Sequence, residues 1–174
     1  MERLLAAMLV SDPQVVVSSA GTYAMVGWPM DGPMAQLVAE LGVDPGGFAA
    51  RRLTPELVRE ADLVLTATRE HRAAVVRQHP AAVRYTFTLK EFVRLVQAAL
   101  AGSSGSLPGQ GGSLHERLAA LVSAAVAQRG VQVVSAAEDD VVDPYNLPDA
   151  AYQGSFLDIK TALEQLHGLL EATA

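Results

Sequence analysis

The spacing of apolar residues predicts a helix at each end of the chain. Leu4, Leu5, Met8 and Leu9 fall on one face of a helix expected over Met1–Val10. A longer helix is expected from about Asp149 to Glu171. Its apolar residues recur at alternating spacings of four and three and form one core-facing stripe: Tyr152, Phe156, Ile159, Leu163, Leu166 and Leu170.

Three short apolar runs between these helices are typical of strands. They are Val15–Val17, Asp62–Thr66 and Arg84–Thr88. Helical segments separate them, and helix-start signals mark several of these segments: Pro33 before Met34–Leu41, Thr54-Pro55, and Thr68 before a helix to about Gln78. Strands separated by helices predict an α/β fold, with a parallel sheet covered on both faces.

The second half of the chain contains two capping boxes. Thr88 pairs with Glu91, and Ser113 pairs with Glu116, so a helix is expected after each hydroxyl residue. A stretch rich in glycine and serine, at about 101–113, lies between them. The segments on either side are too small to fold alone, so we interpret this stretch as a surface insertion within a single domain of residues 1–174.

Composition excludes several classes of function. The net charge is -6 and the basic residues are scattered, which argues against a nucleic-acid partner. No apolar run is long enough to span a membrane and the first residues lack a secretory signal, so we expect a cytoplasmic protein without a membrane partner. The four histidines are far apart and the sequence has no cysteine, so neither a metal site nor a cofactor is expected.

The stretch Glu138–Tyr145 is the strongest candidate for chemistry. It places Asp143 directly before Pro144, and a proline pushes the preceding residue into an extended conformation. The neighbouring Asp139 and Asp140 could raise the proton affinity of Asp143, as general-acid catalysis near neutral pH requires. The alternative interpretation is that Asp-Pro forms a turn and the acidic run is a solvated loop.

Six short motifs together resemble the low-molecular-weight protein-tyrosine phosphatases in an actinobacterial style. In order they are Met1–Leu5, Ser18–Thr22, Gly27–Asp31, Ala50–Thr54, Ala61–Leu65 and Asp143–Tyr145. The resemblance implies a three-layer, Rossmann-like domain with a parallel four-stranded sheet. It also implies hydrolysis of phosphotyrosine in a protein substrate through a phosphocysteine intermediate.

The resemblance also assigns roles to individual residues. Asp143 matches the general acid and base, and Tyr145 the aromatic residue that flanks the substrate cleft. Met25 and Trp28 are both candidates for lining the substrate pocket. Ser19 matches a serine that steadies the phosphate-binding loop in relatives; the alternative is a hydroxyl bonded locally at the end of a strand.

The sequence departs from the family pattern at the phosphate-binding loop. Family members have a central strand and a Cys-x5-Arg loop ahead of the first helix, whereas this sequence begins at that helix. We therefore expect the chain to be N-terminally truncated and inactive as given. Loss of strand hydrogen bonds, at roughly 1 kcal/mol each, rivals the roughly 5–15 kcal/mol that stabilises a domain, so marginal stability or aggregation is also expected.

Two alternatives stay open at this point. A phosphatase-derived binding or regulatory domain could have lost its catalytic loop. The intact Asp143-Pro144-Tyr145 motif argues mildly against this interpretation. An arsenate reductase built on the same fold is less favoured, because that enzyme class needs several cysteines.

Overall fold

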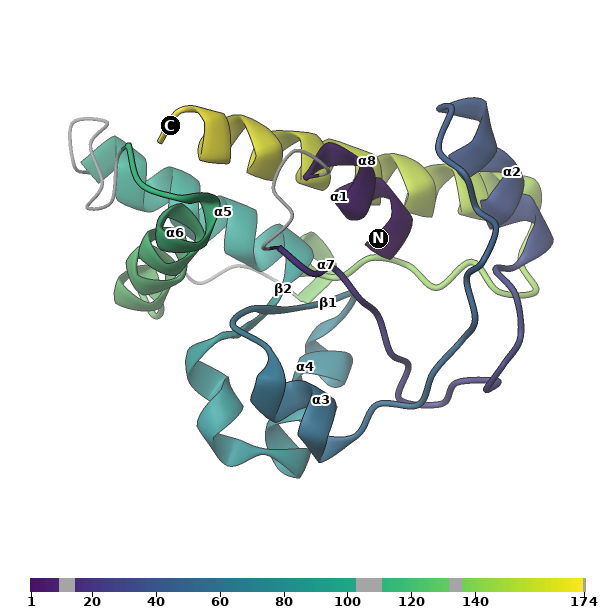
Figure 1. The fold of residues 1–174 in the computed structure, drawn as a ribbon, viewed down its shortest axis with the longest axis horizontal. Coiled ribbons are helices and arrows are strands. Elements are labelled where there is room, and N and C mark those ends of the chain that lie inside the picture. Colours follow the sequence, from purple (N-terminus) through teal and green to yellow (C-terminus); the bar gives the residue numbers. More distant parts are fainter. Residues whose placement is uncertain (10–14, 103–110, 132–135, 174) are drawn as a thin grey trace.

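The computed structural model describes residues 1–9, 15–102, 111–131 and 136–173 (Figure 1). Its strands are β1 (Val64–Thr66) and β2 (Thr86–Thr88). Its helices are α1 (Glu2–Met8), α2 (Gly32–Glu40), α3 (Pro55–Glu60), α4 (Arg69–Gln78), α5 (Leu89–Gly102), α6 (Leu114–Gln128), α7 (Ala136–Asp139) and α8 (Asp149–Glu171), with one 3-10 turn, η1 (Pro80–Arg84).

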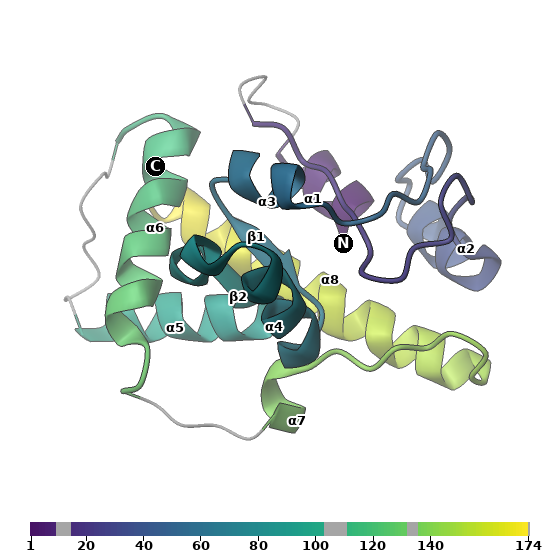
Figure 2. The same cartoon turned by 90° about the horizontal axis from the view of Figure 1, so that it is seen from below.

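Strands β1 and β2 form a parallel pair joined by α4, with Leu65 opposite Phe87. Helices cover both faces of this pair: α3 and α4 lie on one side, and α5 and α8 lie on the other (Figures 1 and 2). The arrangement confirms the α/β class and its three layers. The described residues contain two of the three strands expected from the sequence.

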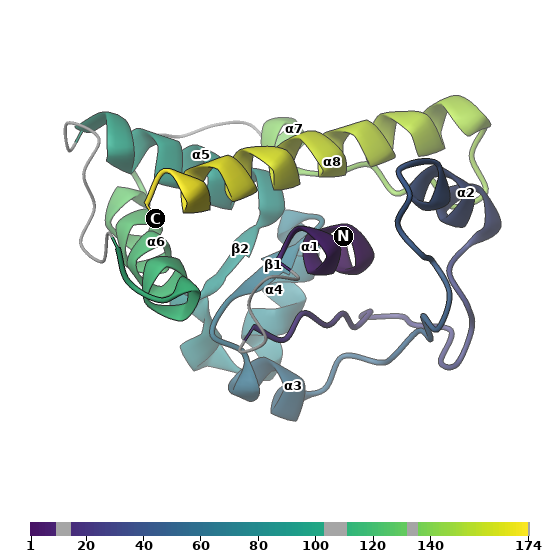
Figure 3. The same ribbon diagram turned by 45° about the horizontal axis from the view of Figure 1, so that its top comes forward.

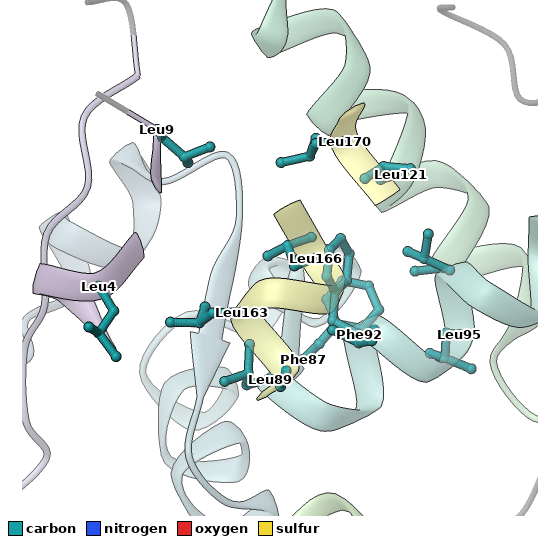
Figure 4. Packing of buried hydrophobic residues seen from close by; sticks show 14 of the residues in the cluster. Leu4, Leu9, Phe87, Leu89, Phe92, Leu95, Leu121, Leu163, Leu166 and Leu170 are labelled. Atoms are coloured by element: carbon teal, nitrogen blue, oxygen red, sulfur yellow. The ribbon is translucent and has the colours of Figure 1, made fainter. Parts of the chain in front are cut away.

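The main core lies between β2 and the helices α5, α6 and α8 (Figure 4). Phe87 of β2 and Phe92 of α5 are fully buried, and their rings pack with centroids 5.1 Å apart and planes tilted by 57°. Leu163 and Leu166 of α8 belong to the same buried cluster. The apolar stripe of the last helix therefore faces the core, as its spacing predicted.

The helix-start signals in the sequence are confirmed. Thr88 and Glu91 exchange two hydrogen bonds at the start of α5, each 3.1 Å long. Ser113 and Glu116 form the equivalent capping box at the start of α6. A cap of this kind satisfies amide groups that the first turn of a helix leaves without partners, which explains why these boundaries were predictable.

The expectation of a strand at Val15–Val17 is wrong. These residues have no strand partner among the described residues, although Val15 and Val17 pack against the main core. An apolar, β-branched run favours extended backbone, but a strand also needs a hydrogen-bonded neighbour. Further along, one parallel bridge joins Gly21 to Arg52, and the two extended segments run side by side there (Figure 3).

Other boundaries also differ from expectation, and β1 begins at Val64 rather than Asp62. Strand β2 begins at Thr86 rather than Arg84, because η1 occupies Pro80–Arg84 and proline favours the first turn of a helix. Helix α5 continues to Gly102, into the predicted surface insertion. Residues 103–110 of that insertion lie outside the described residues.

Candidate active site

Residues 139–147, here called the acid loop, are attached to the carboxyl end of β1. The N–H of Val141 donates to the carbonyl of Ala67 at 2.9 Å, and the N–H of Arg69 donates to Asp140 Oδ1 at 2.8 Å. Ser155 of α8 donates to the carbonyl of Val142 at 2.6 Å. The carboxyl edge of parallel strands is where α/β proteins bind their ligands, so the acid loop lies at the expected edge.

Basic side chains hold the first part of the acid loop. Asp139 is only 3% exposed and forms ion pairs with Arg69 at 2.8 Å and Arg94 at 3.1 Å. The hydrogen bond that Arg69 donates to Asp139 raises the pKa of Arg69. Lys90 donates to the carbonyl of Asp140 at 3.3 Å. The sequence suggested Asp139 and Asp140 as like-charged neighbours of Asp143, but their carboxylates accept hydrogen bonds from Arg69 and Arg94.

Asp143 lies beyond these anchors and is exposed. Its Oδ1 accepts a hydrogen bond from the N–H of Tyr145 at 3.1 Å, and Leu147 donates to the carbonyl of Pro144 at 2.9 Å. Asn146 completes the turn with a φ of 58°, a conformation that asparagine tolerates better than most residues. Asp143 therefore presents its second carboxylate oxygen from a short, internally bonded turn.

Aromatic residues flank the turn. The Tyr145 side chain is 51% exposed. Tyr152, one turn into α8, is buried, and a hydrogen bond to Asp31 raises its pKa. Asp31 precedes α2, and α2 packs against α8, the helix that follows the acid loop.

Met25 and Trp28 belong to a tight turn. Trp28 donates to the carbonyl of Met25 at 3.0 Å, and Gly27 has a φ of 82°, which favours glycine. Backbone bonds of 2.8 Å in both directions attach this turn to Ala50. Met25 is 46% exposed and Trp28 is 60% exposed, so both side chains are available to a ligand.

Ser19 faces the start of the first helix. Its hydroxyl donates to Glu2 Oε2 at 2.5 Å, and its carbonyl accepts two hydrogen bonds from the Arg51 side chain at 3.0 and 3.2 Å. Arg3, one residue further along α1, donates to the carbonyl of Gly46 at 2.5 Å. Arg3 is thus directed at a loop carbonyl.

The described residues offer an acid and nearby aromatic groups. The sequence has no cysteine, and within the described ranges no three histidine or acidic side chains gather as metal ligands would. A cavity of about 430 Å³ beside α4 is lined by Tyr23, His71 and Arg77 among others, but by none of the predicted site residues. No helix of the described part is long and apolar enough to cross a membrane.

The sequence alone did not reveal how the acid loop is held. Arg69 and Arg94 lie far from Asp139 in the sequence, and only the fold brings them together. The position of Arg69, three residues after the end of β1, could have indicated a contact with the acid loop. Residues at that edge of a sheet tend to face ligands or the loops that cover them.

Comparison with curated proteins supports one family. The chain is 42% identical over 79 residues to the low molecular weight protein-tyrosine-phosphatase Etp of Escherichia coli K12, which covers 45% of this chain and 51% of Etp. It is 35% identical over 79 residues to the probable phosphatase EpsP of Ralstonia nicotianae, covering 45% of this chain and 54% of EpsP. The chain spans about half the length of the curated relatives it matches.

Solved structures support the same fold. Erwinia amylovora tyrosine phosphatase AmsI matches with a TM-score of 0.64 at 21% identity, over 94% of this chain and 78% of AmsI. The YwlE arginine phosphatase of Geobacillus stearothermophilus matches with a TM-score of 0.65 at 23% identity, over 98% of this chain and 84% of YwlE. The family model described as low molecular weight phosphotyrosine protein phosphatase matches residues 1–102. The chain therefore belongs to the low molecular weight phosphotyrosine protein phosphatase family.

Proposed function

We propose that this chain carries the acid loop and the substrate-binding aromatic residues of a cytoplasmic protein-tyrosine phosphatase. Asp143 is the general acid and base in this proposal. The observation that carries it is the acid loop, which is fixed to the end of β1 through Val141 and leaves Asp143 exposed in the turn beyond. A solvated acidic loop without a function would not need these anchors.

The proposed reaction has two steps. In the first, a cysteine thiolate attacks phosphorus, the bond from phosphorus to the tyrosine oxygen breaks, and the Asp143 carboxyl gives its proton to the leaving oxygen. In the second, the Asp143 carboxylate takes a proton from water, the water oxygen attacks the phosphocysteine, and the bond from sulfur to phosphorus breaks. Phosphate leaves and the thiolate is restored.

The thiolate and the phosphate-binding arginine come, in this proposal, from a Cys-x5-Arg loop outside the given sequence. The hydrogen bond from Ser19 to Glu2 supports this arrangement, because it fixes the start of α1, which would follow such a loop. Helix N-termini stabilise bound anions through their free N–H groups. Ser19 then acts by holding this helix terminus rather than by touching phosphate.

Tyr145, Trp28 and Met25 are the proposed contacts to the tyrosine ring of the substrate. All three side chains are about half exposed, and the helices that follow the segments carrying them, α2 and α8, pack against each other. An exposed aromatic side chain beside an acid can pack against a phenyl ring while the acid reaches the phenolic oxygen.

The test compares two proteins on a phosphotyrosine peptide: the 174-residue chain, and the same chain preceded by a strand and a Cys-x5-Arg-Ser loop of the family pattern. We expect turnover only from the extended protein, and none when its cysteine is changed to serine. A phosphoarginine peptide serves as the second substrate, because a structural neighbour is an arginine phosphatase.

Two results would oppose the proposal. Turnover by the 174-residue chain itself would show a different nucleophile. An extended protein that folds and binds the phosphotyrosine peptide without hydrolysing it would favour the alternative of a non-catalytic binding domain.

A further inference from the structure

Asp139 is the most buried charged residue near the proposed site, and the reaction does not use it directly. Its side chain is 4% exposed, while its partners Arg69 and Arg94 are 36% and 25% exposed. Arg94 contacts both carboxylate oxygens of Asp139, at 3.2 Å and 3.1 Å. A buried carboxylate of this kind is stable only while its cationic partners stay in place.

The three residues come from different elements. Arg69 begins α4 directly after β1, Arg94 lies in α5, and Asp139 ends α7. The ion pairs therefore hold the start of the acid loop against two helices of the packed domain, four residues before Asp143. Figure 1 shows α7 beside the end of the β1 and β2 pair, with the following segment running along α8.

Backbone contacts continue the attachment towards Asp143. The bonds from Arg69 N–H to Asp140 and from Val141 N–H to Ala67 follow directly after Asp139, and the Ser155 bond to Val142 comes next. Every residue from Asp139 to Val142 is thus held by at least one contact to another element. Beyond Val142, the bonds from Tyr145 to Asp143 and from Leu147 to Pro144 lie within the turn.

We propose that Asp139, through Arg69 and Arg94, is a positioning residue that sets where Asp143 meets the leaving group. This inference rests on the proposed function, in which Asp143 is the acid. Removing the charge of Asp139 takes away the carboxylate that Arg69 and Arg94 share and releases the start of the acid loop. Asp143 keeps its chemistry, but it spends less time within hydrogen-bonding distance of the substrate oxygen.

The first test uses the 174-residue chain and amide hydrogen exchange. Asp139→Asn should speed amide exchange of Val141 and its neighbours in residues 139–147 by about 10-fold or more. The reason is that the acid loop can then open by itself, without unfolding of the rest of the chain. Residues 162–170 of α8 should exchange as in the wild type. The control is Glu164→Gln, which removes one carboxylate from the exposed pair with Lys160 and should change neither region.

The second test measures kcat/KM in the extended protein described above. Two substrates are compared: a phosphotyrosine peptide, whose leaving group needs protonation, and 2,4-dinitrophenyl phosphate, whose leaving group departs as an anion. Asp139→Asn should lower kcat/KM about 10-fold or more for the peptide, and by less than about 3-fold for the activated ester. Arg94→Lys keeps the charge but loses the contact to both carboxylate oxygens of Asp139. The difference between its losses of kcat/KM on the two substrates should therefore lie between those of the wild type and Asp139→Asn.

A purely structural role would lower both kcat/KM values equally and raise exchange throughout the chain. That result, or unchanged values in both tests, would overturn the inference. Failure of the extended wild-type protein to hydrolyse either substrate would instead refute the proposed function. The exchange experiment would then still decide whether Asp139 holds the acid loop.

Discussion

The hydrogen bond from the Val141 N–H to the Ala67 carbonyl, at 2.9 Å, joins the acid loop to the carboxyl end of β1. It connects a strand from the first half of the chain with the loop that precedes the last helix. Asp143 lies two residues after Val141. The position of the proposed acid therefore depends on the contact between Val141 and the end of the sheet. Changes in the anchors should therefore alter catalysis without altering the chemistry of Asp143 itself.

Tyr152 should make stability depend on alkaline pH. Its hydrogen bond to Asp31 raises the pKa of the phenol above the usual 10.0, so the folded state favours the protonated form. The resulting stabilisation is complete below pH 10 and is lost as the pH rises through the folded-state pKa. The denaturation midpoint of the wild type should exceed that of Tyr152→Phe by a constant amount up to about pH 9, and the difference should shrink above pH 10.

Absorbance of the phenolate at alkaline pH provides an independent check of the same hydrogen bond. The wild type should show a tyrosine step raised above the ordinary pKa, and this late step should disappear in Tyr152→Phe. It should also shift towards the ordinary value in Asp31→Ala. A late step that persists in Tyr152→Phe would assign the shift to another tyrosine.

The core of α8 should dominate the stability of the chain. Leu163 is 1% exposed and belongs to the buried cluster that also contains Phe87 and Phe92, so Leu163→Ala removes buried apolar surface and leaves a cavity. We expect a loss of about 3–4 kcal/mol in the free energy of unfolding, measured by urea denaturation. Leu157 lies on the same helix but is 60% exposed.

Leu157→Ala is thus the matched control, with an expected change within about 0.5 kcal/mol. Equal effects of the two substitutions would contradict the packing of α8 described above. A Leu163→Ala chain that shows no cooperative transition would agree with the marginal stability expected from the sequence.

Trp28 and Met25 should differ in their effect on substrate binding. The indole is the larger group and the more exposed one, at 60% against 46%. In the extended protein, Trp28→Ala should raise KM for a phosphotyrosine peptide by about 5-fold or more, consistent with the loss of one aromatic contact of roughly 1 kcal/mol. Met25→Ala should raise KM less. The reverse order would place Met25, rather than Trp28, against the substrate ring.

Local signals explain what the sequence could predict. Thr54, Thr68, Ser113 and the Thr88–Glu91 pair mark helix starts, because each satisfies amide groups within its own first turn. The apolar stripe of α8 was predictable for a similar reason, since the spacing of its apolar residues in the sequence places them all on one buried face of the helix. Asp143 could be located because proline constrains the residue before it.

Features that depend on distant partners were not predictable. Val15–Val17 has the composition of a strand but no hydrogen-bonded neighbour in the described residues. Composition indicates an extended backbone, but it does not predict whether a partner strand lies alongside. Asp139 looked like part of a solvated acidic run, and only the approach of α4 and α5 gives it Arg69 and Arg94. The hydrogen bond from Ser19 to Glu2 likewise joins two segments that the sequence did not connect.

The most direct test of the account is the turnover of Asp143→Asn in the extended protein on a phosphotyrosine peptide. Because asparagine cannot donate the proton or accept one from water, we expect kcat to fall by about two to four decades. Binding of a non-hydrolysable phosphonate analogue should stay within about 3-fold of the wild type, since the proposed phosphate contacts come from the added Cys-x5-Arg loop. Unchanged turnover in this variant would contradict the assignment of Asp143 as the general acid and base.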